Sequence, residues 1–60
     1  MPVVVVEWWE GRTLEQKKQV AKDITSSFIK IDIPGDAVQI VFKDNPKHNW
    51  ARGGKLASET

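Results

Sequence analysis

The sequence predicts an α/β fold: a βαβ unit with two parallel strands, followed by a short C-terminal β-hairpin. Three segments support this prediction: an apolar run at residues 3–9, an amphipathic segment at residues 14–31 and a second β-rich run at residues 38–43. Two strands joined by a crossover helix lie parallel, and the crossover is right-handed. Because 60 residues suffice for one domain at most, we expect a single domain over residues 1–60.

The first strand is predicted by residues 3–9, VVVVEWW, which are almost all β-branched or aromatic. A nearly continuous apolar run is typical of a strand that is covered on both faces. Successive side chains point to opposite faces of a strand, and one helix covers only one face. The other face must therefore meet another subunit. The two predicted sets are Val4, Val6 and Trp8 on one face, and Val3, Val5 and Trp9 on the other.

A helix from about residue 14 to residue 31 is predicted by a capping box and an apolar stripe. Thr13 and Gln16 have the capping-box spacing, and Val20, Ile24 and Phe28 follow each other at intervals of four. Pro34 marks the end of this segment, because the residue before a proline is pushed out of the helical region.

The second strand is predicted at residues 38–43, with Val38, Ile40 and Phe42 on one face. Residues 44–47 are predicted to form a loop. A hairpin is predicted from residues 49–52 and 55–58, because Gly53-Gly54 between them supplies the positive φ that a tight turn needs.

Composition excludes several classes of function. Nine basic residues face eight acidic ones, and the formal net charge of +1 gives no footprint for nucleic acid or an anionic membrane surface. The chain has no cysteine and a single histidine, which leaves no metal-ligand spacing. The apolar run is far shorter than the roughly 18 residues of a membrane span. We expect a cytoplasmic homo-oligomer without metal, nucleic-acid or membrane partners.

Pro2 is a candidate catalytic residue because of its place directly after Met1. Removal of Met1 would give Pro2 a free secondary amine, and apolar neighbours or a guanidinium would lower the pKa of that amine. A general base works best when its pKa lies near the operating pH. A proline here is far more often a strand end without any chemistry, and the residues alone do not decide between the two interpretations.

Two motifs make the whole chain resemble the 4-oxalocrotonate tautomerase family: "EGRTLEQKKQV" at residues 10–20 and "NWARGGKLAS" at residues 49–58, behind a Met-Pro start. The resemblance implies the tautomerase/MIF-like fold, in which two protomers join their sheets into four strands and three such dimers form a hexamer. It also implies an isomerase, active in aromatic-compound catabolism, that needs no cofactor.

The resemblance assigns roles to individual residues. Pro2 matches the family's general base and acid, and Arg12 matches the arginine that holds a substrate carboxylate. Trp50 stands where the family usually has a pocket phenylalanine. Gln39 replaces a second arginine that reaches in from a neighbouring subunit, and Arg52 is a candidate to supply the missing cation. Trp8 and Trp9 are interpreted mainly as interface packing, with one of them possible at the pocket mouth.

The predicted function is keto–enol tautomerisation of small unsaturated 2-oxo or 2-hydroxydienoate carboxylates. The alternative is a structural or binding oligomer of the same fold with weak tautomerase or hydratase activity. Gln39 keeps this alternative open, since loss of one preorganised donor costs about 10²–10³ in turnover.

Overall fold

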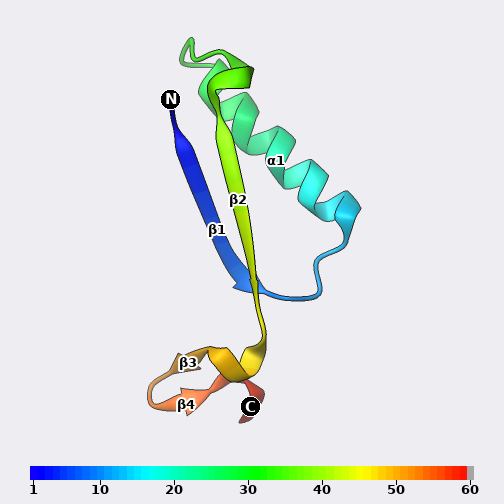
Figure 1. The fold of residues 1–60 in the computed structure, drawn as a ribbon, viewed down its shortest axis with the longest axis vertical. Helices are drawn as coiled ribbons and strands as arrows, with labels where there is room; N and C mark the ends of the chain where they lie inside the picture. The colour runs from blue at the N-terminus through cyan, green and yellow to red at the C-terminus, as the bar shows by residue number, and fades with distance from the viewer. Residues whose placement is uncertain (60) are drawn as a thin grey trace.

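The computed structural model describes residues 1–59 and has the predicted order of elements (Figure 1). Strand β1 spans Val3–Trp9, helix α1 spans Leu14–Ile29 and strand β2 spans Gln39–Asn45. Two short strands follow, β3 at Ala51–Arg52 and β4 at Lys55–Leu56, and short 3₁₀ turns lie before and after them. The α/β prediction is therefore confirmed.

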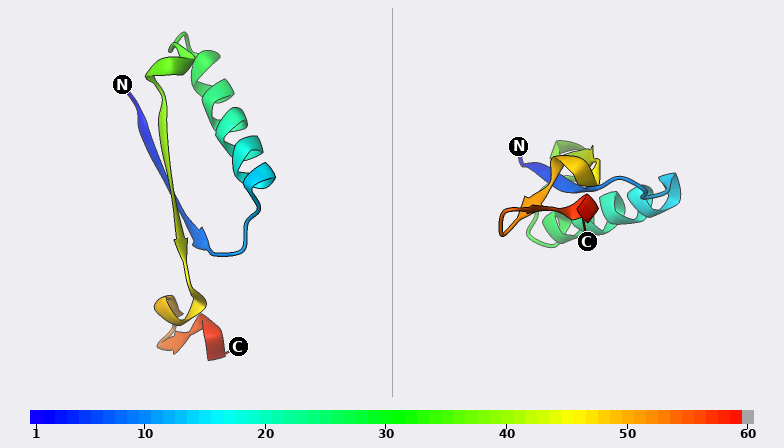
Figure 2. Two further views of the ribbon diagram at one scale, coloured as in Figure 1. Left: turned by 45° about the vertical axis from the view of Figure 1, so that its right-hand side comes forward. Right: turned by 90° about the horizontal axis from the view of Figure 1, so that it is seen from below.

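Strands β1 and β2 form a two-stranded parallel sheet, as the βαβ prediction requires. The register runs from Val3 opposite Gln39 to Trp9 opposite Asn45. Helix α1 lies along one side of this sheet, as the two views of Figure 2 show. Each strand therefore keeps one unpaired edge and contributes one face that α1 leaves uncovered.

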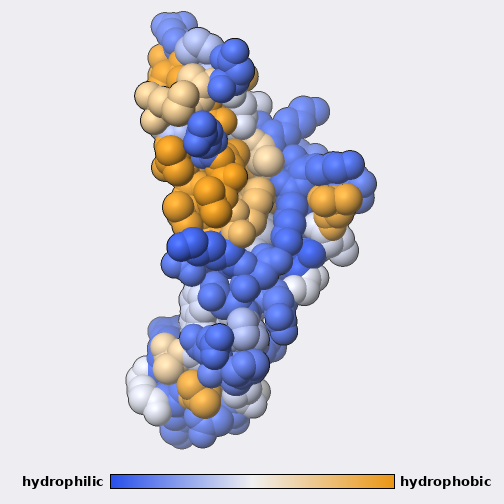
Figure 3. All heavy atoms as spheres, viewed as in Figure 1, coloured by the Kyte–Doolittle hydropathy of each residue, from blue (hydrophilic) through white to orange (hydrophobic). Residues whose placement is uncertain are grey.

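Burial alternates along β1 as the sequence predicts. Val4, Val6 and Trp8 are half-buried beneath α1, whereas the alternate residues are exposed. Val3 is 58% and Val5 50% exposed. Val41 of β2 adds to this uncovered surface, which forms a hydrophobic patch over the strands in Figure 3.

Helix α1 begins as predicted and ends two residues earlier than predicted. Thr13 Oγ1 accepts a hydrogen bond from the Gln16 amide at 3.1 Å, and Gln16 Oε1 accepts one from the Thr13 amide at 2.9 Å, which completes the capping box. At the other end the Ile33 amide donates to the Phe28 carbonyl in the manner of a Schellman motif. The Ile31 amide donates to the Phe28 carbonyl, three residues back, and Asp32 has a φ of 69°, so residues 30–32 form a turn that ends α1.

Strand β2 differs from the predicted residues 38–43, because it begins at Gln39 and continues to Asn45. Asp44 and Asn45 pair with Trp8 and Trp9 and do not form part of a loop. The Asn45 carbonyl also accepts a hydrogen bond from the Glu10 amide at 2.9 Å. Asp44 and Asn45 have polar side chains that are typical of loops. In the strand these side chains form hydrogen bonds with residues of other elements.

The predicted hairpin is present, although its strands are shorter than predicted. β3 and β4 pair in antiparallel fashion around Gly53 and Gly54, whose φ angles are 62° and 80°. This hairpin and its flanking turns, residues 47–59, form a C-terminal arm that projects beyond the end of the sheet (Figure 1).

The isolated protomer lacks a hydrophobic core: no side chain among residues 1–59 is fully buried. Its radius of gyration is 14.6 Å, compared with about 10 Å for a compact domain of 60 residues. Its accessible surface is 4768 Å², compared with about 4,000 Å² for a compact monomer of this mass. Both values favour a chain that completes its core against other subunits.

Candidate active site

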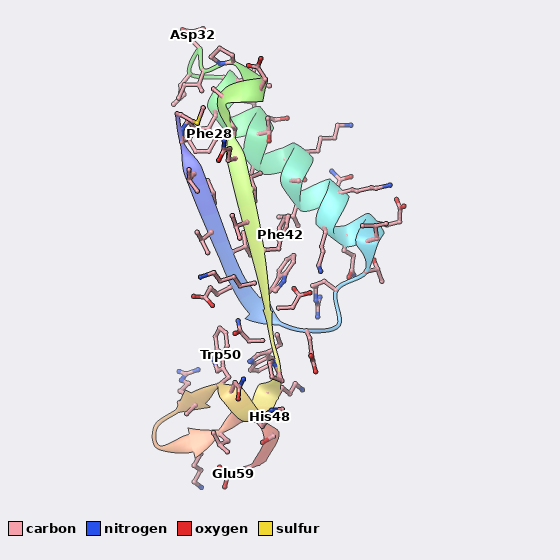
Figure 4. The ribbon with its side chains drawn as sticks, in the orientation of Figure 1. Phe28, Asp32, Phe42, His48, Trp50 and Glu59 are labelled. Atoms are coloured by element: carbon pink, nitrogen blue, oxygen red, sulfur yellow. The ribbon has the colours of Figure 1, made fainter. Side chains whose placement is uncertain are left out.

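A pocket of about 650 Å³ opens where β1 ends and α1 begins. Strand β1 and its following loop contribute Glu7, Trp8, Trp9 and Arg12 to the pocket wall. Helix α1 contributes two glutamines and Val20, and the arm contributes Trp50. In Figure 4 Trp50 points from the arm toward the end of the sheet. The fold thus unites two predicted site residues, Arg12 and Trp50, that are 38 positions apart.

Arg12 is positioned by its two neighbours in sequence. Gly11 has a φ of 115°, a conformation that L side chains rarely adopt, and it turns the chain after β1. Thr13 then begins the capping box of α1. Among residues 1–59 the Arg12 guanidinium forms no ion pair and no hydrogen bond, so its donors are available to a ligand in the pocket.

Aromatic rings form much of this end of the molecule. Trp8 stacks on Phe42 with ring centroids 5.2 Å apart, and Trp9 meets Trp50 edge to face at 6.1 Å and 79°. The Lys47 ammonium lies 5.0 Å from the Trp9 ring centroid, within the range of a cation–π interaction. Trp8 and Trp9, interpreted from the sequence mainly as interface packing, therefore both line the pocket. Their position as an aromatic doublet directly before the "EGR" motif is the sequence signal that could have placed them there.

A polar cluster at the end of β2 holds the Trp8 side chain in its place in the pocket wall. Asp44 accepts hydrogen bonds from the Trp8 indole and from the Lys17 ammonium of α1, each at 2.5 Å. These donors, Lys17 first and Trp8 second, lower the pKa of the Asp44 carboxyl. The cluster ties β1, α1 and β2 together beside the pocket. The sequence offered no spacing that would have identified it.

Pro2 and Gln39 lie at the opposite end of the sheet from Arg12. The backbone amide of Gln39 donates a hydrogen bond to the Pro2 carbonyl at 3.0 Å. The side-chain amide of Gln39 contacts Met1 Sδ at 3.4 Å. The seven-residue strand β1, about 23 Å long, separates this pair from the pocket. One protomer therefore does not unite Pro2 with Arg12.

Arg52 lies beside the pocket and not among its lining residues. With Lys55 it lines a second hollow of about 510 Å³ in the arm, which shares Trp9 and Trp50 with the first pocket. The tryptophan pair therefore lies between Arg12 and Arg52. Within residues 1–59 no three His, Cys, Asp or Glu side chains gather as metal ligands would, and no helix is long and apolar enough to cross a membrane.

Comparison with known proteins gives consistent results. The family model described as "Tautomerase enzyme" matches residues 2–59. A "Probable tautomerase" of Lactococcus lactis is 44% identical over 57 residues, covering 93% of each chain. A 2-hydroxymuconate tautomerase of Comamonas testosteroni is 35% identical over 60 residues, covering 98% of this chain and 95% of the relative.

Solved structures show the same likeness in three dimensions. A 4-oxalocrotonate tautomerase isozyme from Methylibium petroleiphilum superimposes with a TM-score of 0.87 at 34% identity, over 95% of this chain and 94% of that one. A subunit of the heterohexameric 4-oxalocrotonate tautomerase from Chloroflexus aurantiacus gives 0.88 at 27% identity, over 98% and 97%.

Proposed function

The chain belongs to the tautomerase family, and from that premise we propose that it is a cofactor-independent keto–enol isomerase. Its substrates are small unsaturated 2-oxo or 2-hydroxydienoate carboxylates. The relative that acts on 2-hydroxymuconate supports this substrate class. The observation that carries the proposal is the pocket that joins the ring of Trp50 to the guanidinium of Arg12, which has no partner among residues 1–59.

Pro2 is the general base in this proposal, once Met1 has been removed. Its neutral secondary amine takes the hydroxyl proton of the dienol, or a proton α to the 2-oxo group. The electron pair moves along the conjugated chain, and the protonated amine returns the proton to a carbon atom further along. One proton leaves and one is returned, so the reaction needs no external oxidant or reductant.

Arg12 anchors the substrate carboxylate, because its planar fork pairs bidentately with a carboxylate and stays charged at any working pH. Trp50 excludes water from the reacting atoms. Gln39 donates a weak hydrogen bond where the family resemblance implies a second arginine, and Arg52 is a second candidate donor from the arm.

The active site is shared between protomers. Pro2 and Arg12 of one chain lie at opposite ends of β1, so a working site takes Pro2 from one protomer and Arg12 from another. We propose a homohexamer, built as a trimer of dimers with four-stranded sheets. The uncovered sheet face, the lack of fully buried side chains among residues 1–59 and the heterohexameric neighbour support this assembly.

The second candidate function is a binding or structural oligomer with only weak tautomerase or hydratase activity. Gln39 favours it, since a neutral amide balances less of the charge that develops on an enolate than an arginine does. Both candidates share one fold and one assembly, so activity distinguishes them.

Replacement of the base tests the proposal. We expect Pro2→Ala to lower kcat/KM for 2-hydroxymuconate or phenylenolpyruvate by at least about 100-fold, the usual contribution of a positioned general base. Mass spectrometry must first confirm that both proteins have lost Met1, because an acylated nitrogen is not basic. Equal rates for the two proteins would reject base catalysis by Pro2 and favour the binding oligomer.

A further inference from the structure

We propose that the pocket selects a monocarboxylate with a flat aromatic tail over a dicarboxylate, and that Trp9 is the residue that sets this selectivity. The proposal deepens the function above by naming the substrate class of the same site. Turnover of such a substrate rests on the proposed function, whereas the binding preference of the pocket does not.

The charges of the pocket favour one carboxylate. Arg12 is the only cation among its lining residues, and Glu7 is the only anion. Lys47 and Arg52 lie near the tryptophan pair but do not line this pocket. A dicarboxylate that pairs with Arg12 inside the pocket would therefore place its second carboxylate among tryptophan rings or near Glu7. An ion that loses water without gaining a partner is costly to bind. Gln39, which replaces the second arginine of the family resemblance, is neutral, so it adds no compensating charge when a neighbouring protomer brings it to the site.

The shape of the pocket favours an aromatic tail. The Trp9 and Trp50 rings stand at 79° to each other with their centroids 6.1 Å apart, and they form a corner beside Arg12. A planar ring bound in this corner can stack on one indole and meet the other edge to face. Each such aromatic pair adds about twofold to tenfold in affinity beyond its buried area.

Trp9 is better suited than Trp50 to discriminate between ligands. The Lys47 ammonium, which is not among the lining residues of the pocket, lies 5.0 Å from the Trp9 ring centroid. Trp9 is 42% exposed in the isolated protomer, and its side chain lines the pocket. Its indole is therefore a pocket-lining ring that already has neighbours on the arm, which lowers the ordering cost of binding.

Binding of two unreactive probes of similar length tests the proposal without turnover. Isothermal titration of the assembled full-length protein, freed of Met1, compares cinnamate with trans,trans-muconate. We expect cinnamate to bind at least about tenfold more tightly. Trp9→Leu should weaken cinnamate about tenfold and change muconate less than about threefold, whereas Trp9→Phe should keep the preference because it keeps an aromatic face. Trp9→Met is the substitute should Trp9→Leu fail to assemble, because it fills the site without an aromatic ring, and the same loss is expected.

Muconate binding as tightly as cinnamate to the wild type would overturn the proposal. Equal weakening of both probes by Trp9→Leu would overturn it as well. Failure of the proposed function looks different: cinnamate is still preferred, yet phenylenolpyruvate is not turned over and Pro2→Ala changes nothing.

Discussion

Two local features of the backbone position the Arg12 side chain at the pocket. Gly11 provides a turn that few other residues can make, and the Thr13–Gln16 capping box starts α1 directly afterwards. The guanidinium between them is left without a protein partner among the described residues and faces the tryptophan-lined pocket. Its donors are therefore free to meet a substrate carboxylate.

Removal of this charge should weaken substrate binding. We expect Arg12→Gln to lower kcat/KM by about 10- to 100-fold, mainly through KM, because a hydrogen bond to a charged group contributes about 1.5–3 kcal/mol. The kcat/KM of Arg12→Lys should fall between those of the wild type and Arg12→Gln, since lysine keeps the charge and loses the planar fork of the guanidinium. Steady-state kinetics on phenylenolpyruvate measures this, with circular dichroism as the control for folding. An unchanged KM in Arg12→Gln would remove Arg12 from the site.

At the scale of the elements, the Asp44 cluster connects stability with the site. Asp44 at the end of β2 holds both Lys17 of α1 and the Trp8 ring of β1. The side chains of Lys17 and Asp44 are only 28% and 34% exposed, so water screens this ion pair less than the Lys18–Glu15 pair on the outer surface of α1, which spans 3.8 Å.

Loss of the Asp44 charge should destabilise the fold in a pH-dependent way. Because the folded state lowers the pKa of Asp44, its contribution is fully present above the ordinary pKa of 3.8 and is lost as the pH falls through the lowered value. We expect Asp44→Asn to melt a few degrees below the wild type at pH 7, with the gap narrowing below pH 4. Thermal melts at equal protein concentration measure this, and Lys18→Gln is the matched control without effect. A gap that is constant with pH would contradict the assignment.

The elements also show what the sequence predicts and what it does not. The bounds of β1, the capping box and the Gly-Gly hairpin were predicted, because each depends on local chemistry. The extension of β2 to Asn45 was missed, since the partners of Asp44 lie 27 and 36 positions away. The contact between Trp9 and Trp50 depends in the same way on where the arm lies beyond the end of the sheet, which no local pattern encodes.

At the scale of the whole molecule, the shape of the protomer itself indicates assembly. Its principal extents are 43, 23 and 13 Å, and the arm stands clear of the sheet (Figure 1). Val3, Val5 and Val41 remain about half exposed on a sheet face that no element of the chain covers. A domain this small is marginal even when compact, so contacts between copies must supply the missing burial.

The central claim is that each active site combines Pro2 of one protomer with Arg12 of another, and co-assembly of two impaired variants tests it most directly. Pro2→Ala and Arg12→Gln subunits are unfolded together, refolded as mixed oligomers, confirmed by native mass spectrometry and assayed on phenylenolpyruvate. Random mixing in equal amounts restores about a quarter of the sites if the two residues come from different chains. We predict recovery to about that fraction of wild-type activity. Mixed oligomers no more active than the separate variants would contradict the account.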